Sequence, residues 1–373
     1  MIYIHVPFCR SFCTYCGFYS EVAGPGRDEK VFGTYTDFLK KEIAERKAEI
    51  EATSGTNTLY IGGGTPSVLP LSLLGDIVGA LPGGDWDEFT VEVNPEDIVE
   101  KGVDYAHGLR SLGVNRVSMG VQSFDDCTLR WMNRRHDSRR AREAFRILRE
   151  AGIGNISIDL IFGIGGVGDQ QWRETVLQAL HIGDECGGRP QHISAYQLSI
   201  EDGSALDRMI RDGRYSEASE ELCRSQYEIL CKELSEAGYS HYEVSNFALP
   251  GFEARHNSAY WTRIPYVGLG AGAHSFDGTV RRWNSEMNDH GHWTCESETL
   301  SLEDAVVEKK MLSLRTARGI DEQWLMDNSD PATVRRLLSE GALVMADGGV
   351  AGTMIRIPES SFFVSDEIIR ELI

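Results

Sequence analysis

The feature that most constrains the fold is a regular alternation of short apolar runs with longer helical patterns in the first half of the chain. The runs are rich in β-branched residues and predict strands at Ile2–Val6, Thr58–Ile61, Phe89–Val93, Arg116–Val121, Asn155–Phe162 and His192–Leu198. The helical patterns between them cover Tyr35–Glu51, Leu71–Leu81, Asp97–Leu112, Arg139–Ala151 and Gln171–Glu185. This alternation predicts βα units with parallel strands and crossover helices. Six strands are too few for a closed eight-stranded barrel, so we expect an open, partial (β/α)6 barrel, an α/β fold with its site at the carboxyl ends of the strands.

The rest of the chain predicts two further segments. A helical pattern at Ser216–Ala237 completes the barrel, which we place at residues 1–240. Residues 241–300 are rich in Gly and aromatic residues and show little regular period. Residues 301–373 predict a smaller, mostly helical domain with a Gly-Gly hairpin at 341–357, an arrangement typical of winged-helix-like domains. Its predicted helices are Glu303–Thr316, Asp321–Met326, Pro331–Glu340 and Ser365–Leu372.

The charge balance argues against one class of partner. The chain carries 37 Lys and Arg residues against 57 Asp and Glu residues, which gives a formal net charge of −20. Such a field repels phosphate backbones, so nucleic acid is not an expected partner. No apolar run is long enough to span a membrane. The first residues, MIYIHVPF, lack the basic and long apolar regions of a secretion signal, so we expect a cytoplasmic protein.

Three of the eight cysteines lie in one short stretch, PFCRSFCTYCGF at residues 7–18. Cys9, Cys13 and Cys16 have the spacing C-x3-C-x2-C. Clustered thiols in the cytosol more often bind metal than form disulfides, and thiolates favour zinc or iron–sulfur clusters. A closed zinc site needs four ligands, so zinc would require a distant fourth residue. A [4Fe–4S] cluster on three cysteines instead leaves one iron open to a substrate or cofactor, and this cluster is the expected occupant.

Polar side chains occur where the predicted strands end. The segment YIGGGTPS at residues 60–67 contains three glycines directly after a strand, which lets the backbone approach a ligand closely. Other polar residues end a strand, interrupt it or lie just beyond it: Glu92, Gln122, Arg134 and Asp159. Taken singly, each is equally well read as a cap or a surface residue. Together they form a ring of carboxylate, amide and guanidinium groups that suits ribose hydroxyls and a zwitterionic amino acid.

The cysteine spacing, with the aromatic Tyr15 before the last cysteine, resembles that of the radical S-adenosylmethionine (SAM) superfamily. The resemblance implies a [4Fe–4S] cluster whose open iron chelates the amino and carboxylate groups of SAM. An electron from such a cluster cleaves the sulfonium and yields a 5′-deoxyadenosyl radical. The order of motifs over about residues 1–285 is similar to that of the oxygen-independent coproporphyrinogen III oxidase family and its relatives.

That family resemblance also implies which residues contact SAM. Residues matching a first SAM site are Tyr3, Gly63 and Glu92. Residues matching a second SAM site are Tyr15, Gly64, Thr65, Gln122, Arg134 and Asp159. Whether one or two SAM molecules bind stays open at this point.

One departure from the oxidases concerns Phe18. The oxidases carry a further cysteine two residues after the third ligand, and this chain has Phe18 at that position. A phenyl ring cannot replace a thiol in proton, radical or redox chemistry, which puts coproporphyrinogen decarboxylation in doubt. The missing cysteine is typical of another branch of the family, the heme chaperone HemW branch.

A second motif, HNSAYW, matches the H-N-x-x-Y-W pattern of that branch and contains His256, Asn257, Tyr260 and Trp261. A His beside aromatic residues offers imidazole to a heme iron and ring faces to a porphyrin. The alternative is a packed loop with a hydrogen-bonded His. His274, in GAHS, competes as the axial ligand. Whether heme binds covalently stays open.

The resemblance therefore implies a radical SAM-type heme chaperone that binds a [4Fe–4S] cluster, SAM and heme and delivers heme to a client hemoprotein. A flavodoxin or ferredoxin as electron donor, and peripheral contact with membrane hemoproteins, are compatible with that function. Two alternatives stay open. One is an oxygen-independent coproporphyrinogen III dehydrogenase of porphyrin biosynthesis, and the other is a radical SAM enzyme that opens the heme ring.

Overall fold

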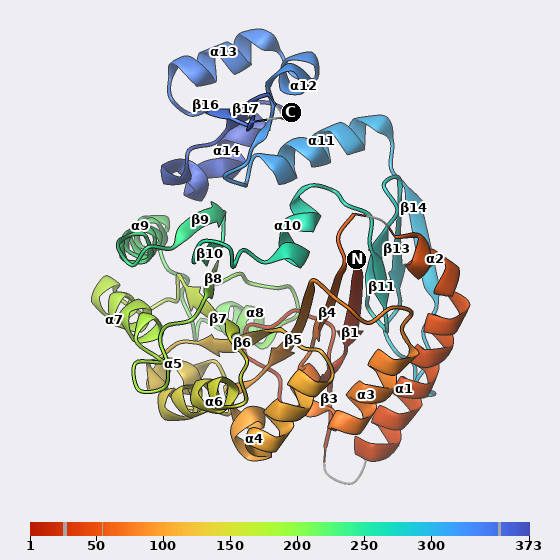
Figure 1. Cartoon of the computed structure of the whole chain (residues 1–373). Coiled ribbons are helices and arrows are strands. Elements are labelled where there is room, and N and C mark those ends of the chain that lie inside the picture. Colours follow the sequence, from red (N-terminus) through yellow and green to blue (C-terminus); the bar gives the residue numbers. More distant parts are fainter. Residues whose placement is uncertain (25–27, 54, 350–351) are drawn as a thin grey trace.

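The computed structural model describes residues 1–24, 28–53, 55–349 and 352–373, and a curved, nine-stranded mixed sheet forms its centre (Figure 1). The six predicted strands are parallel and adjacent in chain order, as expected for a partial barrel. They are β1 (Ile2–Val6), β4 (Thr58–Gly63), β5 (Glu88–Val93), β6 (Arg116–Gln122), β7 (Asn155–Phe162) and β8 (His192–Gln197). Each lies within a few residues of its predicted bounds, because long β-branched runs between helices leave little choice of register.

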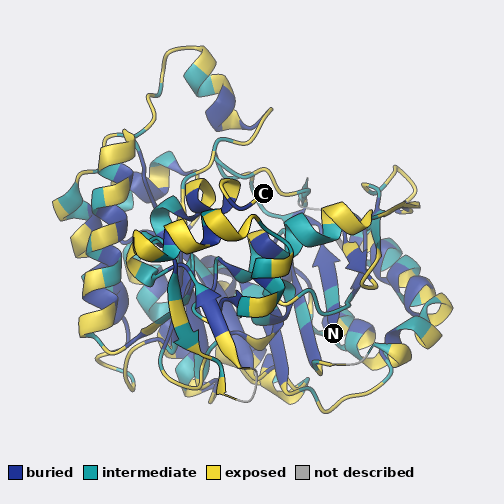
Figure 2. Cartoon of the chain, turned by 90° about the horizontal axis from the view of Figure 1, so that it is seen from above, coloured by how far each residue is buried: buried dark blue, intermediate teal, exposed yellow. Residues whose placement is uncertain are grey.

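Helices cover the outer face of this sheet, and their exposed residues lie on the side away from the strands (Figure 2). The helices of this part of the chain are α1 (Asp28–Glu45), α2 (Lys47–Ala52), α3 (Leu71–Ala80), α4 (Pro95–Ser111), α5 (Asp126–Trp131), α6 (Ser138–Glu150), α7 (Asp169–Leu180), α8 (Ala205–Arg211) and α9 (Glu220–Glu236). Of these, α8 does not belong to the outer layer, because the amide of its Leu206 donates to the carbonyl of Thr14 near the carboxyl ends of the strands. The predicted Tyr35–Glu51 segment is split between α1 and α2. Helix α7 ends well before the predicted Glu185, because the chain turns tightly at Gly183, where a Cβ atom would lie 1.8 Å from the carbonyl oxygen of Gly188.

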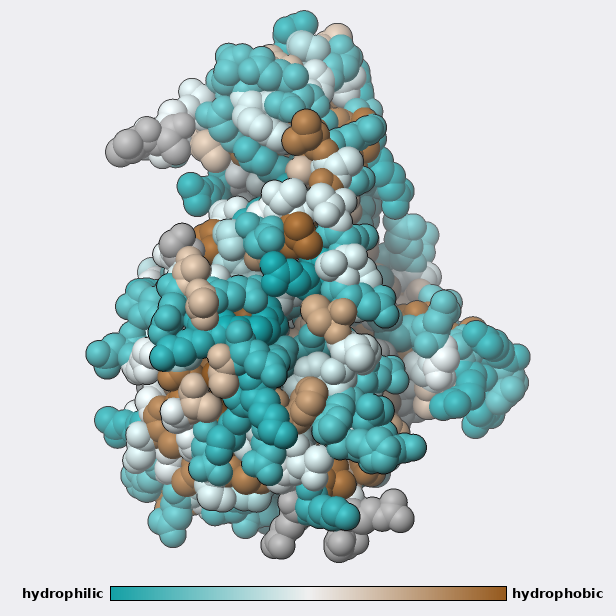
Figure 3. Space-filling view, turned by 90° about the vertical axis from the view of Figure 1, so that its right-hand side faces the viewer, coloured by the Kyte–Doolittle hydropathy of each residue, from teal (hydrophilic) through white to brown (hydrophobic). Residues whose placement is uncertain are grey.

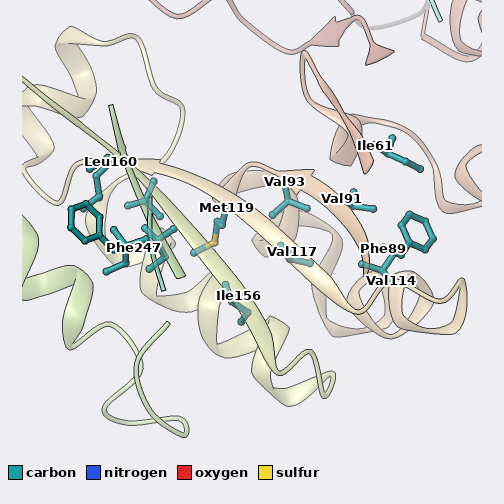
Figure 4. Close-up of a cluster of buried hydrophobic side chains, with 14 of the residues drawn as sticks. Ile61, Phe89, Val91, Val93, Val114, Val117, Met119, Ile156, Leu160 and Phe247 are labelled. Carbon is teal, nitrogen blue, oxygen red and sulfur yellow. The ribbon is translucent and has the colours of Figure 1, made fainter. Parts of the chain in front are cut away.

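The two faces of the parallel strands differ in chemistry. On β6, Val117 and Met119 are fully buried and belong to the apolar core between sheet and helices, shown in close-up in Figure 4. The alternate residues Arg116 and Ser118 line the inside of the barrel. Successive side chains of a strand point to opposite faces, so the same strand builds the core and the cavity. Three of the polar residues expected to form a ring, Glu92, Gln122 and Asp159, lie on this inner face for that reason, whereas Arg134 reaches the cavity from the loop after α5.

The segment after residue 239 is more regular than predicted. It contains β9 (Ser240–Glu243), β10 (Asn246–Ala248), α10 (Arg255–Trp261), β11 (Val267–Leu269), β12 (His274–Phe276), β13 (Val280–Asn284) and β14 (Cys295–Thr299). β11 pairs with β1, and β10 pairs with β8, so this segment extends both edges of the sheet. Strands β12, β13 and β14 form a separate antiparallel sheet. Strands this short show no readable period, which explains why the sequence analysis missed them.

The C-terminal part is helical with a small antiparallel sheet, as predicted, and lies beyond the barrel at the top of Figure 1. Its elements are α11 (Leu302–Ser313), β15 (Ile320–Asp321), α12 (Glu322–Asp327), α13 (Pro331–Ser339), β16 (Val344–Asp347), β17 (Thr353–Arg356) and α14 (Ser365–Arg370). The predicted Gly-Gly hairpin is the β16–β17 pair, although residues 350–351 of its turn lie outside the described residues.

The surface around this part and the adjoining barrel is mainly hydrophilic in Figure 3, with scattered apolar side chains. Among the described residues, no helix has both the length and the hydropathy needed to cross a membrane.

Candidate functional site

A cavity of about 500 Å³ lies inside the barrel and opens where the parallel strands end. Its lining brings together most of the residues that the sequence analysis selected: Cys9, Cys13, Tyr15, Cys16, Gly63, Gly64, Thr65, Glu92, Gln122, Arg134 and Asp159. Phe18 lies at its rim and is 74% exposed. All lining residues fall between Cys9 and Asn257, so the described C-terminal part contributes none.

The loop that carries the three cysteines is held against two neighbouring segments. The amide of Thr14 donates to the carbonyl of Met132 over 3.1 Å, and its hydroxyl donates to the carbonyl of Trp131 over 2.8 Å. The carbonyl of Thr14 accepts from the amide of Leu206 over 2.8 Å. The strand before the loop, β2 (Phe8–Cys9), pairs with β3 (Glu21–Val22) just after it. The loop is therefore fixed at both ends and in its middle.

The three thiols share one electrostatic environment. Burial raises the pKa of Cys9, and burial together with repulsion by Cys13 and Cys9 raises the pKa of Cys16 to about 11. Arg134 acts in the opposite direction on both thiols. Half-buried thiolates placed beside one another are unfavourable alone, so the donor set fits a positively charged iron–sulfur unit.

The spacing of these groups disfavours a single bound ion. Among the described residues, no group of three or more His, Cys, Asp or Glu side chains is arranged to hold one metal ion. A cluster that places each thiolate on a different iron needs no such convergence. The residues present therefore fit a [4Fe–4S] cluster better than a closed zinc site.

The glycine-rich segment runs directly beside the cysteine loop. The amide of Gly64 donates to the carbonyl of Val6 over 2.8 Å, and the amide of Thr65 donates to the carbonyl of Phe8 over 2.7 Å. A Cβ atom on Gly64 would lie only 2.8 Å from the carbonyl oxygen of Phe8. Gly63 has a φ of 109°, which favours glycine. The glycines are thus needed for the close approach of two backbone segments, in addition to any approach to a ligand.

Two partly buried carboxylates face the cavity. Glu92 accepts from the hydroxyl of Tyr60 over 2.6 Å and from the amide of Gly63 over 3.1 Å, and burial raises its pKa to about 7. Asp159 accepts from the hydroxyl of Ser118 over 3.1 Å, and burial raises its pKa as well. Each can accept further hydrogen bonds from hydroxyl or ammonium groups of a ligand.

Gln122 and Arg134 are held in specific conformations at the same mouth. Gln122 ends β6 at an irregularity of the β6–β7 register and has a φ of 66°, which is rare for a residue with a side chain. Arg134 donates to the carbonyl of Gly120 over 2.6 Å. Burial alone would lower the pKa of Arg134, but Cys13 and Tyr15 keep it above its ordinary value. Arg134 therefore remains a cation beside the cysteine loop.

Tyr3 and three residues of the HNSAYW motif lie outside the cavity lining. The hydroxyl of Tyr3 is hydrogen-bonded to Nδ1 of His5 over 3.0 Å. His256 is 1% exposed, and its ring nitrogens are hydrogen-bonded to the hydroxyls of Thr58 over 2.9 Å and Tyr260 over 3.0 Å. This is the packed arrangement that was the alternative to heme binding.

The motif forms α10 and lies at the opposite end of the strands from the cysteines. The amides of Arg255 and His256 donate to the carboxylate of Glu88, the first residue of β5. Asn257 alone of the motif's four named residues reaches the cavity lining. Trp261 ends the helix and is half-buried. The competing His274 is exposed on β12, and its ring stacks on that of Trp283 with centroids 6.4 Å apart.

Several cavity residues were missed by the sequence analysis: Tyr60, Asn94, Arg116 and Tyr196. Asn94 follows β5 directly, in the segment VEVNPED at residues 91–97, and its position after a strand was the available signal. Tyr60 and Arg116 lie within strands, and only the inward face of the barrel distinguishes them from core residues. That face is set by tertiary structure.

Comparison with known proteins supports the family suggested by these motifs. The profile of the Radical SAM superfamily matches residues 3–179. The heme chaperone HemW of Bacillus subtilis is 30% identical, covering 93% of this chain and 93% of its own length. HemW of Lactococcus lactis is 34% identical, covering 85% of this chain and 82% of its own length.

A solved structure shares the fold. Coproporphyrinogen III oxidase (HemN) from Escherichia coli, a radical SAM enzyme, superposes with a TM-score of 0.79 at 21% identity, covering 100% of this chain and 89% of its own. At that identity the likeness concerns the fold alone. Taken with the relatives above, it shows that the chain belongs to the radical SAM superfamily and, within the coproporphyrinogen III oxidase-like family, to the HemW branch.

Proposed function

We propose that this protein is a radical SAM-type heme chaperone that binds a [4Fe–4S] cluster, SAM and heme and passes heme to a client hemoprotein. The observation that carries the proposal is the likeness to HemW heme chaperones over as much as 93% of the chain. The exposed Phe18 at the cavity rim supports it, because this position offers no thiol for the oxidase chemistry.

The cluster and SAM would share the barrel cavity. Cys9, Cys13 and Cys16 would hold the cluster at the mouth, where it would supply a site for SAM and an electron. Glu92 and Asp159 would accept hydrogen bonds from the hydroxyl and ammonium groups of SAM, and Arg134 would attract its carboxylate. The backbone of Gly63 and Gly64, with Thr65, Tyr15 and Gln122, would shape the remaining contacts. Tyr3 lies behind Tyr60, 6.0 Å between ring centroids, and would act through that ring.

Heme would need an accessible imidazole, and the two candidate histidines differ in that respect. His274 is exposed beside Trp283, and partial burial together with Arg281 lowers its pKa. A neutral imidazole is the form that binds iron. His256 would first have to break its hydrogen bonds to Thr58 and Tyr260. The geometry therefore favours His274 as the ligand that requires no rearrangement, with His256, Asn257, Tyr260 and Trp261 as the alternative heme site.

The remaining parts of the proposal rest on the same relatives. We place the protein in the cytoplasm, where a flavodoxin or ferredoxin would supply electrons to the cluster. The client hemoprotein would bind at the surface, including peripherally at a membrane. The coproporphyrinogen III dehydrogenase of porphyrin biosynthesis and the heme-opening enzyme remain the alternatives.

The decisive experiment titrates heme into anaerobically reconstituted protein and follows its absorbance. Stoichiometric binding that weakens at least tenfold in His274→Ala, but not in His107→Ala, supports the proposed ligand. His107 is an exposed histidine on α4 and serves as the matched control. Weakening in a folded His256→Ala variant instead would assign heme to the HNSAYW motif.

A parallel sample receives coproporphyrinogen III, SAM and reductant. Protoporphyrinogen formed over many turnovers would refute the chaperone and show that Phe18 does not disable the oxidase reaction. Loss of heme absorbance with SAM and reductant would identify the heme-opening enzyme instead.

A further inference from the structure

Two of the three cysteines are joined by a continuous series of side-chain hydrogen bonds. Sγ of Cys9 lies 3.4 Å from the hydroxyl of Thr65, and that hydroxyl lies 3.1 Å from Nδ2 of Asn94. Oδ1 of Asn94 lies 2.6 Å from Nη2 of Arg134. Nη1 of Arg134 lies 3.4 Å from Sγ of Cys13. These side chains form a sulfur-to-sulfur relay with Asn94 at its centre.

The chemistry of the donors fixes the direction of three of the four bonds in this relay, and the proposed cluster fixes the fourth. A guanidinium only donates, so the atom of Asn94 that faces Arg134 is the amide oxygen. The amide nitrogen of Asn94 must then face Thr65 and donate to its hydroxyl oxygen. A Cys9 thiolate bound to iron carries no hydrogen, so in the proposed cluster site the hydroxyl of Thr65 is the donor to Cys9. Both sulfurs are acceptors, as thiolates bound to iron would be.

Hydrogen bonds to its backbone hold Asn94 in position. It is the N-cap residue of α4, yet its side chain makes no capping hydrogen bond, although Asn is among the best capping residues. The backbone N–H of Asn94 donates to the hydroxyl of Ser67 over 3.1 Å, and that hydroxyl donates to the carboxylate of Asp97 over 2.7 Å. Ser67 is fully buried. The side chain of Asn94 is thus held in place and directed to the relay rather than to its own helix.

Cys16 lies outside this relay. Its thiol accepts a backbone hydrogen bond from Phe18, and no side-chain hydrogen bond to it occurs among the described residues. The cysteines are therefore not equivalent, and Asn94 affects two of them at once.

We infer that Asn94 is a positioning residue of the cluster site, which directs the hydroxyl of Thr65 to Cys9 and the guanidinium of Arg134 to Cys13. The inference rests on the proposed cluster and deepens it. Hydrogen bonds to cluster sulfurs stabilise the more negative, reduced state and so raise the reduction potential. Asn94 accordingly helps to set how easily the cluster accepts an electron.

Two substitutions test the two arms of the relay. Thr65→Val keeps the shape of Thr65 but removes the hydrogen bond to Cys9. Asn94→Asp keeps an oxygen for Arg134 but removes the N–H, so the hydroxyl of Thr65 turns from Cys9 to the new carboxylate. Asn115→Asp is the matched control, because it makes the same chemical change at an asparagine that bonds Phe89 and Trp86 away from the cavity.

The measurement is a redox titration of the reconstituted cluster without SAM, followed by electron paramagnetic resonance. We expect both variants to shift the potential downward by about a tenfold change in the reduction equilibrium, which is 59 mV for one electron. The double variant Thr65→Val/Asn94→Asp should lower the potential no further than Asn94→Asp alone, because both changes remove the same bond to Cys9. The control should leave the potential unchanged.

Potentials of Thr65→Val and Asn94→Asp equal to wild type would overturn the inference while leaving the proposed cluster intact. Failure of the wild-type chain to take up iron and sulfide would overturn both. If Asn94→Asp loses its cluster, the nearly isosteric Thr65→Val still decides, since its potential must fall if the hydroxyl donates to Cys9.

Discussion

The hydroxyl of Tyr60 donates a hydrogen bond of 2.6 Å to the carboxylate of Glu92 inside the barrel. Both residues come from adjacent strands, β4 and β5, and both line the cavity. The bond and the amide of Gly63 offset only part of the cost of burying Glu92, because burial still raises its pKa to about 7. Glu92 therefore changes charge near neutral pH.

Replacing Glu92 by Gln should change how stability depends on pH. The pKa of Glu92 rises from 4.5 in the unfolded chain to about 7 in the folded one, so the wild type loses stability as pH rises through this window. Glu92→Gln lacks this loss. The free energy of unfolding of Glu92→Gln minus that of wild type should therefore be more favourable to the variant at pH 7.5 than at pH 4.5, by on the order of 3 kcal/mol. Urea unfolding of cluster-free protein at both pH values measures it. The exposed Glu303→Gln is the control. This account would be contradicted if the stability of Glu92→Gln relative to wild type did not vary with pH, or varied only as much as that of Glu303→Gln.

Replacing Gly64 by Ala should destabilise the junction between the glycine-rich segment and the cysteine loop. The new methyl group would lie 2.8 Å from the carbonyl oxygen and 2.9 Å from the amide nitrogen of Phe8, and backbone atoms there cannot move aside cheaply. We expect a loss of about 1–3 kcal/mol in the free energy of unfolding. Gly79→Ala is the control, because no atom lies within 4 Å of its Cβ position on α3. That change should stabilise the helix by about 0.5–1 kcal/mol. Equal effects of the two changes in thermal unfolding would refute the steric argument.

Replacing His241 by Phe should protect the protein against mild acid. His241 stacks on Phe247 at 4.0 Å and contacts Phe362 at 4.9 Å, and burial lowers its pKa to about 4. The unfolded chain takes up a proton below about pH 6.5, so the wild type loses stability as pH falls from there towards 4. His241→Phe has no such proton to take up. Its free energy of unfolding relative to wild type should therefore be about 2 kcal/mol more favourable at pH 5 than at pH 7.5. Urea unfolding at the two pH values checks it, with the exposed His107→Gln as control. An unchanged difference would mean that His241 is protonated in the folded protein.

Replacing Glu42 by Gln should loosen the packing of α1 against the later part of the chain. The carboxylate of Glu42 accepts hydrogen bonds from the amide of Gly270 at 2.9 Å, from Asn284 at 2.8 Å, and from the indole of Trp293 at 3.1 Å. An amide has only one oxygen, so its NH2 group would face at least one of these donors. We expect a loss of about 3 kcal/mol in the free energy of unfolding. Glu45→Gln, exposed on the same helix, should change little. Denaturation followed by Trp fluorescence compares them, and similar midpoints for the two variants would count against the network.

Much of the barrel could be predicted because its strands are long and their apolar pattern is strong. β1 and β7 occur at their predicted bounds, and the cysteine spacing together with the residues at the ends of β4 and β5 indicated one site. Local spacing suffices for such features, since parallel strands meet at one edge. The short strands β9, β10 and β11, which extend the two sides of the sheet, were not predicted, because three or four residues do not show a period.

The sequence by itself determined the family, the partial barrel and the three candidate cluster ligands, because these depend on short spacings and on the order of strands and helices. Only the tertiary structure decided that Asn94 joins Thr65 to Arg134, and that His256 is packed against Thr58 at the far end of the strands. Both relationships link residues that are distant in the chain. A hydrogen bond between distant residues depends on where the folded backbone places two side chains, and no local pattern records that placement.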